Sequence, residues 1–398
     1  MSLFTRVEMA PRDPILGLTE QFAADARAHK VNLGVGVYLD AQGKIPVLAC
    51  VAQAEKAQLS AVKPKGYLPI DGISSYDTAV KHLVFGADSA LVRESRVATV
   101  QALGGTGGLK VGADFLRELN PGAQVLISDP SWENHRALFT RAGFEVDTYP
   151  YYDAQIRGVR VDAMLARLSE ARPGTIVVLH ACCHNPTGYD LTPAQWEQVV
   201  QVARERQLIP VLDMAYQGFG EGIAEDGAAV HKFAAAGIDF FVASSFSKSF
   251  SLYGERVGAL SVVCQSAEES ARVLSRLKIV VRTNYSSPPT HGAQLVATVL
   301  TSPELRQQWE QELGGMRQRI KSMRQALVAG LRHAGVQQDM SYILAQRGMF
   351  SYSGLSAPQM QRLRNDFGVY GLDSGRICVA ALNEVNLAPV IQAIVSVM

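Results

Sequence analysis

Three short apolar runs recur in the middle of the chain, and polar residues follow each of them closely. The runs span residues 175–180, 208–213 and 239–244. Between the first two, Thr192 followed by proline is typical of a helix start, and residues 196–204 continue with helical spacing of the apolar positions. Short runs that are apolar throughout are typical of strands buried on both faces. Their alternation with helices predicts an α/β fold with a mostly parallel central sheet.

A longer helical pattern begins after this region. It runs through residues 302–335, and we expect it to be interrupted at Gly314 and Gly315 because glycine is a poor helix former. Shorter strand-like pieces follow at residues 349–352 and 376–379. We therefore place a change of domain near the double glycine.

Polar side chains stand where the three predicted strands end. In open α/β sheets, ligands bind beyond the carboxyl ends of the strands, so we expect these side chains to converge on one site. They are His184 and Asn185, Asp213 and Tyr216, and Ser245 and Lys248.

Composition narrows the range of partners. The chain has 398 residues, of which 47% are hydrophobic and 19% charged, with a net charge of +1 and no basic block. This balance predicts no nucleic-acid or membrane-surface partner. The first residues lack the uninterrupted apolar stretch of a signal peptide, and no stretch of about 18 apolar residues occurs, so we expect a cytoplasmic protein. The cysteines are odd in number and form no C-x-x-C pair, which predicts reduced, mostly buried thiols: Cys50, Cys182, Cys183, Cys264 and Cys378.

A glycine-rich segment at residues 101–110 precedes a helix that we expect from Gly108 to Leu119. Free backbone N–H groups at a helix start favour an anion, and a phosphate suits them. The segment fits neither the P-loop nor the dinucleotide-binding fingerprint. It fits a plain strand-to-helix turn equally well.

Two other motifs also have a purely structural interpretation. Residues 184–188 fit a β-turn, and Asp213 fits a capping or salt-bridged carboxylate. A metal site at Cys182, Cys183 and His184 is disfavoured because adjacent side chains of a strand point to opposite faces, and we expect no metal. We interpret Cys183, like His180, as a packing residue outside the site.

Lys248 lies among hydroxyl groups, just after the third apolar run and before Arg256. A lysine that is desolvated near another cation has a lowered pKa and becomes a nucleophilic amine able to form a Schiff base. The hydroxyls and Arg256 suit a phosphate. One lysine, one aspartate (Asp213) and a phosphate cradle on successive strand ends together indicate a pyridoxal phosphate site.

Ten segments spread over nearly the whole chain strengthen this interpretation. They are residues 32–38, 67–72, 104–107, 131–135, 183–188, 213–219, 245–248, 253–256, 282–289 and 374–376. Together they resemble the class I aminotransferases of the fold type I pyridoxal phosphate architecture, in the aspartate and aromatic amino-acid branch. The resemblance implies a small α/β domain formed by both chain ends. We expect an N-terminal arm and part of this small domain in residues 1–45, the large cofactor-binding domain in 46–313, and the rest of the small domain in 314–398.

The resemblance also implies roles for the strand-end residues. Lys248 would form a Schiff base with pyridoxal 5'-phosphate and move the substrate proton. Asp213 would pair with the ring nitrogen, supported by His135, while Tyr216 and Asn185 would bind the phenolic oxygen. The remaining implied cofactor contacts are Trp132, Gly105, Thr106, Ser245, Arg256 and, from the neighbouring subunit of a homodimer, Tyr67.

For the substrate, the resemblance implies two arginine contacts. Arg376, helped by Gly36 and Asn185, would bind the α-carboxylate, and Arg282 from the neighbouring subunit would bind a second carboxylate. The other implied pocket residues are Ile45, Ser287, Trp132 and Phe350.

Ile45, Ser287 and Leu39 make the pocket more apolar than is usual in the aspartate-specialised members, whereas Thr106 and Val37 fit the aspartate-type pattern. We therefore expect an aromatic-amino-acid aminotransferase that moves the amino group of Phe or Tyr, and also Asp, to 2-oxoglutarate by a ping-pong mechanism.

Three alternatives stay open. The first is an aspartate aminotransferase with side activity on aromatic amino acids. The second is a pyridoxal-phosphate-dependent lyase, against which the paired arginines Arg282 and Arg376 argue. The third is a ligand-sensing regulator with an added DNA-binding segment; the residues before Asn32 show no helix-turn-helix pattern.

Overall fold

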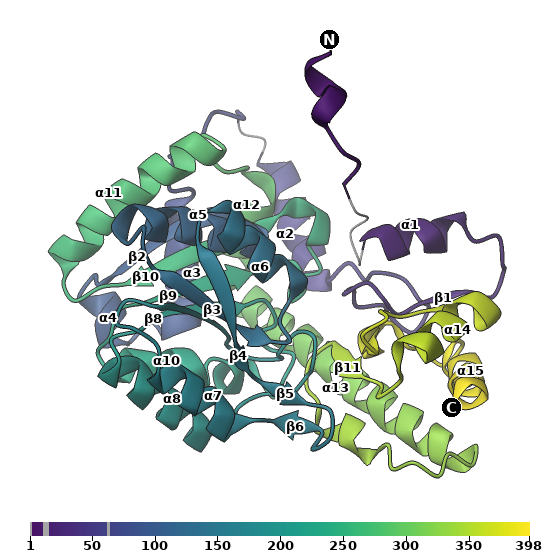
Figure 1. The fold of residues 1–398 in the computed structure, drawn as a ribbon. Coiled ribbons are helices and arrows are strands. Elements are labelled where there is room, and N and C mark those ends of the chain that lie inside the picture. The colour runs from purple at the N-terminus through teal and green to yellow at the C-terminus, as the bar shows by residue number, and fades with distance from the viewer. Residues whose placement is uncertain (1, 11–15, 62–63) are drawn as a thin grey trace.

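A seven-stranded sheet forms the centre of the larger part of the molecule (Figure 1). The computed structural model describes residues 2–10, 16–61 and 64–398. In spatial order the strands are β2 (Val97–Leu103), β10 (Val257–Val263), β9 (Phe240–Ser245), β8 (Ile209–Met214), β7 (Ile176–His180), β3 (Gln124–Asp129) and β4 (Glu145–Pro150). The pairs from β9 to β4 are parallel, and β10 runs antiparallel to both its neighbours. The mostly parallel α/β sheet expected from the sequence is confirmed.

The three apolar runs of the sequence are β7, β8 and β9, adjacent in the sheet and within one residue of their expected bounds. Alternate side chains of these strands enter different cores. On β8, Val211 packs into the core on one face of the sheet and Leu212 into the core on the other. Burial on both faces explains why these strands are apolar throughout.

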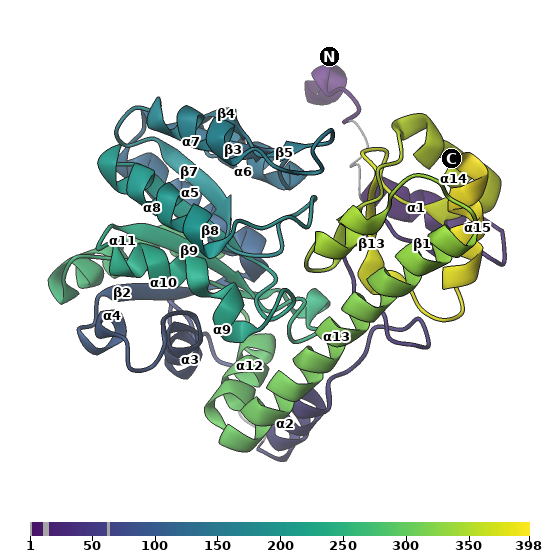
Figure 2. The ribbon, with the colours of Figure 1, turned by 90° about the horizontal axis from the view of Figure 1, so that it is seen from below.

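Helices cover both faces of this sheet (Figures 1 and 2). One face carries α5 (Gly104–Leu119), α6 (Glu133–Arg141) and α11 (Ala267–Asn284), and the other carries α3 (Ser74–Phe85), α7 (Val161–Ser169), α8 (Pro193–Glu205) and α10 (Ala228–Ala235). The expected start of α8 is confirmed, since Thr192 and Gln195 form a capping box around it. The expected start of α5 at Gly108 is wrong, because the glycine-rich segment from Gly104 onward already forms its first turn.

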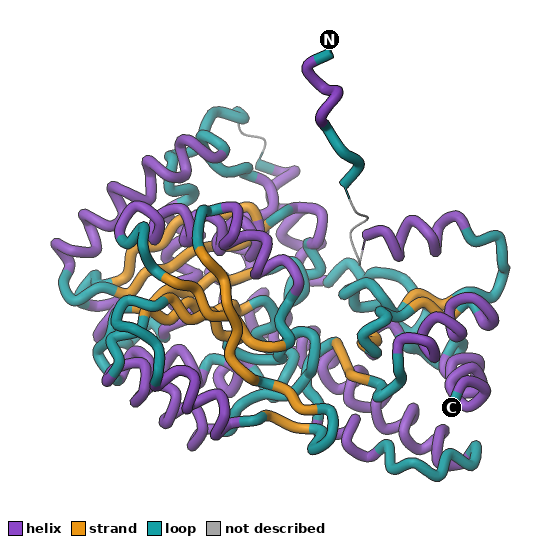
Figure 3. Tube along the Cα trace, viewed as in Figure 1, coloured by secondary structure: helices purple, strands orange, loops and turns teal. Residues whose placement is uncertain are grey.

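Shorter elements complete the larger part. They are α2 (Ala49–Ser60), α4 (Ala90–Arg93), β5 (Tyr152–Asp153), β6 (Gly158–Val159), α9 (Ile223–Asp226), the 3-10 turn η2 (Tyr253–Glu255) and α12 (His291–Thr301). Figure 3 shows the strands in orange and, in teal, the loops that connect strands and helices.

Segments from both halves of the chain meet in a smaller part, where the purple helix that begins at residue 16 lies near the yellow C-terminal segment in Figure 1. Its elements are α1 (Leu16–Ala24), β1 (Val31–Asn32), η3 (Ser341–Ala345), β11 (Phe350–Tyr352), α14 (Ala357–Phe367), β12 (Val369–Tyr370), β13 (Arg376–Cys378), η4 (Val379–Ala381) and α15 (Leu387–Val397). β1 pairs with β12 and β11 with β13. The 3-10 turn η1 (Leu3–Arg6) lies apart from both parts (Figure 1).

A single long helix, α13 (Pro303–His333), joins the two parts (Figure 2). It passes through Gly314 and Gly315 without a break, so the expected interruption is wrong. The neighbours of the two glycines, Leu313 and Met316, are buried, and their packing outweighs the low helix propensity of glycine. The domain bounds remain a prediction, and their boundary at 313/314 falls inside this helix.

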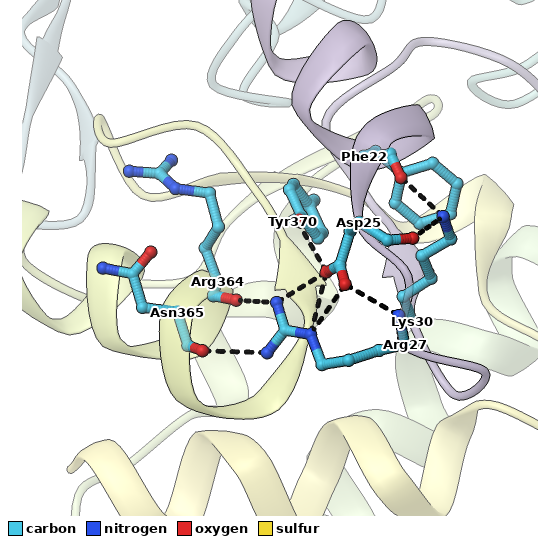
Figure 4. Close-up of polar contacts among 7 residues, drawn as sticks. All are labelled: Phe22, Asp25, Arg27, Lys30, Arg364, Asn365 and Tyr370. Carbon is cyan, nitrogen blue, oxygen red and sulfur yellow. Dashed lines mark hydrogen bonds and ion pairs between the residues drawn. The ribbon is translucent and has the colours of Figure 1, made fainter.

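Arg27 fastens the N-terminal segment to the C-terminal one (Figure 4). Its guanidinium donates to the carbonyl oxygens of Arg364 and Asn365, each at 2.8 Å, at the end of α14. It also binds the carboxylate of Asp25, which accepts a further hydrogen bond from the Tyr370 hydroxyl at 2.7 Å. The Arg27 hydrogen bonds lower the pKa of Asp25, so this carboxylate stays ionised.

Over the described ranges, no helix is both long and apolar enough to cross a membrane.

Candidate active site

A cavity of about 410 Å³ opens at the carboxyl ends of β7, β8 and β9. Its lining comes from both parts of the molecule: Val35, Gly36, Gly105, Thr106, Trp132, His180, Asn185, Asp213, Ala215, Tyr216, Ser245, Ser247, Lys248, Tyr253, Arg256, Phe350 and Arg376. The convergence expected at the strand ends is therefore found for Asn185, Asp213, Tyr216, Ser245 and Lys248. His184 instead lies behind the wall, with its ring stacked on Tyr151.

Asp213, near the end of β8, is held from behind by a histidine. The Nε2 atom of His135, on α6, lies 3.0 Å from Oδ2 of Asp213, and its Nδ1 atom lies 2.9 Å from Oγ of Ser131. Burial by itself raises the pKa of Asp213, but the His135 hydrogen bond and the nearby imidazoles and Lys248 outweigh it, so the pKa is lowered. The cavity thus contains a buried carboxylate that is ionised and available to a cation.

Lys248 lies in the turn that follows β9. Its Nζ atom is 5.0 Å from the ring centroid of Tyr216. Burial lowers the pKa of Lys248 to about 8; the charge of Asp213 opposes this and that of Arg256 adds to it. At pH 7 roughly a tenth of this amine is then uncharged, far more than for an ordinary lysine, and the uncharged form is the nucleophile and proton acceptor.

The first turn of α5 borders the same cavity through Gly105 and Thr106. Gly104 has a φ of 71°, and a Cβ atom there would lie 2.5 Å from the guanidinium of Arg256, so the arginine rests directly on the helix start. Ser245, from the end of β9, approaches Gly105. Unpaired helix N–H groups, a guanidinium and a hydroxyl together form a binding site for an anion such as phosphate.

Arg376 lies on the opposite wall, on β13, and is 1% exposed. Its Nη1 atom donates to Oδ1 of Asn185 at 3.1 Å and its Nη2 atom to the carbonyl of Gly34 at 2.7 Å, while Nε has no hydrogen-bond partner in the described part of the chain. The ring of Phe350 lies 4.2 Å below the guanidinium. Because this buried cation forms no ion pair within the described ranges, it is suited to an anionic ligand that enters the cavity.

Gly36 provides the space that this arrangement needs. A Cβ atom at this position would lie 2.6 Å from Cζ of Phe350. A larger residue would therefore push the ring away from Arg376.

These residues fit pyridoxal phosphate. The group needs a reactive amine, a carboxylate for its ring nitrogen and an anion site for its phosphate, and the cavity supplies Lys248, Asp213 and the start of α5 with Arg256. Its volume lies within the usual range for small-molecule pockets.

Five residues expected in the site do not line this cavity: His135, which lies behind Asp213, and Tyr67, Ile45, Arg282 and Ser287. Tyr67 is 98% exposed and Ile45 is 50% exposed. Arg282 is exposed on α11 and bonds to Ser286, and Ser287 is half-buried in the loop after that helix. Tyr67 and Arg282 are the two residues for which the resemblance implied a contribution to a neighbouring subunit.

Five residues that line the cavity were not expected in the site from the sequence: Val35, His180, Ala215, Ser247 and Tyr253. His180, interpreted as a packing residue, lines the cavity, and neither of its ring nitrogens has a hydrogen-bond partner among the described residues. It ends β7 in register with Asp213, so applying the strand-end rule to that residue would have found it. The Tyr253 hydroxyl accepts a hydrogen bond from the N–H of Tyr38 at 2.9 Å.

A metal site at Cys182 and Cys183 was disfavoured because side chains alternate in a strand, and this reason is wrong. β7 ends at His180, and Cys183 has a φ of 50°, so neither cysteine is in a strand. The sulfur atoms of Cys182 and Cys183 and a carboxylate oxygen of Asp226 lie within 4.8 Å of one another. All three are buried, and the Asp226 carboxylate already accepts three backbone N–H bonds.

Comparison with known proteins places this geometry in context. A family model described as aminotransferase class I and II matches residues 28–394. An aspartate aminotransferase from Pseudomonas aeruginosa is 60% identical, with 100% of both chains covered. The crystal structure of an aromatic-amino-acid aminotransferase from Burkholderia pseudomallei, covalently bound to pyridoxal phosphate, has a TM-score of 0.98 at 65% identity over 100% of both chains. A psychrophilic aromatic amino acids aminotransferase from Psychrobacter sp. B6, cocrystallised with aspartic acid, has a TM-score of 0.97 at 45% identity over 99% of both chains.

Proposed function

This chain belongs to the class I and II aminotransferases, and we propose that it moves the amino group of phenylalanine, tyrosine or aspartate to 2-oxoglutarate, with pyridoxal phosphate bound at Lys248. One observation supports this most strongly. A single cavity brings together Lys248, Asp213 and the unpaired buried cation of Arg376. An amine, a carboxylate and a carboxylate-binding arginine are the groups that amino transfer with this cofactor needs.

The cofactor would be held at three places. Asp213 would pair with the protonated ring nitrogen, and Tyr216 and Asn185 would bind the phenolic oxygen. The phosphate would be held by residues around the start of α5: Gly105, Thr106, Ser245 and Arg256. When bound, pyridoxal phosphate supplies an electron sink that stabilises negative charge at the α-carbon of the amino acid.

Lys248 moves the proton. Its Nζ atom, with a pKa of about 8, accepts the proton released from the α-carbon of the substrate. Trp132 and Phe350 border the cavity with apolar surface, which limits the access of water to this step.

Arg376 orients the substrate. Its planar guanidinium binds the α-carboxylate with two parallel hydrogen bonds, while Asn185 and Gly34 fix the guanidinium plane. Amino acids and 2-oxo acids share this carboxylate, so donor and acceptor use the same position in turn. The reaction is therefore ping-pong.

Side-chain specificity depends on residues at the edge of the site. Arg282 would bind the second carboxylate of aspartate, glutamate or 2-oxoglutarate. Ile45, Ser287 and Leu39 would provide apolar surface for an aromatic ring, whose burial contributes roughly 25 cal/mol per Å². The aromatic-named relative at 65% identity supports use of aromatic amino acids, and the related enzyme cocrystallised with aspartic acid supports dual use.

A second candidate is an aspartate aminotransferase with minor activity on aromatic substrates. Thr106 and Val37 and the Pseudomonas aeruginosa relative favour it.

We also infer a homodimer with shared active sites. Tyr67 and Arg282 are exposed and outside the cavity of their own chain, as expected for residues that complete a neighbouring site. The N-terminal residues add an exposed apolar arm suited to packing on a second copy: Leu3, Phe4, Val7 and Met9. The cytoplasmic location stays a prediction from the sequence.

The proposal is tested with Lys248→Ala. This variant should fold and bind free pyridoxal phosphate, yet retain no covalent cofactor after borohydride reduction and lose almost all amino transfer to 2-oxoglutarate. Lys232→Ala, at a partly buried lysine that pairs with Glu197 outside the cavity, serves as control and should behave as wild type. Full amino transfer by Lys248→Ala would overturn the proposal.

A further inference from the structure

A second arginine is buried in the smaller part, behind the cavity wall. Arg324 lies on α13 and is 3% exposed. Burial lowers the pKa of Arg324 to about 10, so it remains charged at neutral pH. Among the ion pairs of the described residues none involves this guanidinium, and it does not line the cavity. A buried charge without a counterion is costly, so its other contacts need an explanation.

Within the described residues, the three hydrogen bonds that the Arg324 side chain donates all go to one short segment. Nε donates to the hydroxyl of Ser351 at 3.1 Å, and Nη2 donates to the carbonyl of Phe350 at 3.0 Å and to that of Gly348. Gly348 has a φ of 76°, so its carbonyl points away from the regular strand pattern. The arginine supplies donors that a neighbouring strand does not.

This segment forms one side of the carboxylate-binding region. β11 pairs with β13 in the register Tyr352 to Arg376, and Phe350 lies against the Arg376 guanidinium at 4.2 Å. The position of β11 therefore sets the position of the ring on which Arg376 rests.

The same segment also contacts the turn that carries Asn185. The N–H of Arg347 donates to the carbonyl of Gly188 at 2.6 Å. Gly348 packs closely on Cys183, since a Cβ atom at the glycine would lie 2.5 Å from Cβ of that cysteine. Residues 347–352 thus touch both Arg376's strand and the Asn185 turn.

We propose that Arg324 is a positioning residue for the substrate carboxylate, acting through residues 347–352 on Arg376, Phe350 and Asn185. The inference rests on the proposed function, because it assumes that Arg376 binds a carboxylate. Arginine suits the task since its rigid fork reaches several acceptors at once, whereas lysine offers a single flexible point of contact.

Three variants and one control test this. Arg324→Gln and Arg324→Lys remove two or more of the bonds, and Ser351→Ala removes one without removing the charge. Arg362→Gln is the control, because Arg362 also lies in the smaller part and donates to a carbonyl, that of Ser396, away from the cavity. For each cofactor-loaded protein, one measures the KM values for 2-oxoglutarate and phenylalanine, kcat, the cofactor Kd, and the Kd of 3-phenylpropanoate. This probe carries a carboxylate and no amino group.

Arg324→Gln should raise both KM values and the Kd of 3-phenylpropanoate at least about tenfold, with a smaller fall in kcat and an unchanged cofactor Kd. Arg324→Lys should recover part of this loss, Ser351→Ala should raise the Kd about threefold, and Arg362→Gln should match wild type. If Arg324→Gln does not fold, Arg324→Lys and Ser351→Ala decide the question. Probe affinity within twofold of wild type in the folded Arg324 variants, or in Ser351→Ala where no Arg324 variant folds, would overturn the inference. Wild-type protein that binds the probe but transfers no amino group would instead contradict the proposed function.

Discussion

The imidazole of His135 lies between Asp213 and the start of α6, with Nε2 at 3.0 Å from the carboxylate and Nδ1 at 2.9 Å from the hydroxyl of Ser131. His135 is fully buried, so this hydrogen-bonded chain is shielded from water on the side away from the cavity. The arrangement fixes the plane of the Asp213 carboxylate and favours its ionised form. A cofactor nitrogen in the cavity would therefore meet a negative charge that is already in place.

Asp213→Asn keeps the size of the side chain and removes its charge. We expect kcat to fall by at least about a hundredfold, because the ring nitrogen loses the charge that keeps it protonated. Steady-state kinetics with phenylalanine and 2-oxoglutarate measure the loss. Asp147→Asn, at an exposed carboxylate, is the control and should match wild type. A kcat for Asp213→Asn within a few-fold of wild type would contradict the role of this carboxylate.

The lowered pKa of Lys248 predicts how cofactor attachment depends on pH. Only the uncharged amine attacks, so the attachment rate for the cofactor-free protein should rise as pH increases through about 8 and level off above it. Arg256 contributes to the lowered pKa, so Arg256→Gln should move the midpoint to higher pH. Stopped-flow absorbance after addition of pyridoxal phosphate at a series of pH values measures the midpoint. A midpoint near the ordinary lysine pKa of about 10.4 would refute the prediction.

Arg282→Ala should lower the activity on aspartate far more than the activity on phenylalanine. Aspartate loses the partner of its second carboxylate, so its kcat/KM should fall by about a hundredfold or more, whereas phenylalanine should change only a few-fold. The comparison is made in the half-reaction without 2-oxoglutarate, because that acceptor also carries a second carboxylate. Arg276→Ala, on the same helix and paired with Glu118 at the surface, is the control. Equal losses for both amino acids would count against the assigned contact.

A mixed dimer tests whether the sites are shared between subunits. If Lys248 of one chain and Arg282 of the other form one site, a dimer of one Lys248→Ala chain and one Arg282→Ala chain has one intact site. Refolding the two inactive variants together should restore about a quarter of the wild-type activity on aspartate, since half of the dimers are mixed and each has one good site. Each variant refolded alone is the control. No recovery in a mixture shown to contain mixed dimers would mean that both residues serve the same chain.

Much of this site could be predicted from the sequence for a physical reason. Asp213, Ser245 and Lys248 follow apolar runs, and parallel strands bring their carboxyl ends to one edge of the sheet. The apolar runs also predicted β7, β8 and β9 to within one residue, and Thr192 followed by proline predicted the start of α8.

Other features depend on packing that local patterns do not encode. Gly314 and Gly315 predict a helix break, but packing of their buried neighbours keeps α13 continuous. The left-handed backbone at Cys183 brings two cysteines together that alternation in a strand would separate. Arg324 belongs to no sequence motif. The role proposed for it rests on the three-dimensional structure, in which its three acceptors lie on one segment.

The most direct test of the account is a single-turnover experiment on the cofactor-loaded protein with phenylalanine, tyrosine and aspartate in turn and no acceptor. Loss of the visible absorbance of the bound cofactor is followed as its amino form appears. We predict that all three amino acids convert the cofactor, with a rate constant per substrate concentration for the aromatic pair equal to or above that for aspartate. A large preference for aspartate would contradict the aromatic assignment, and no conversion by any of the three would contradict amino transfer itself.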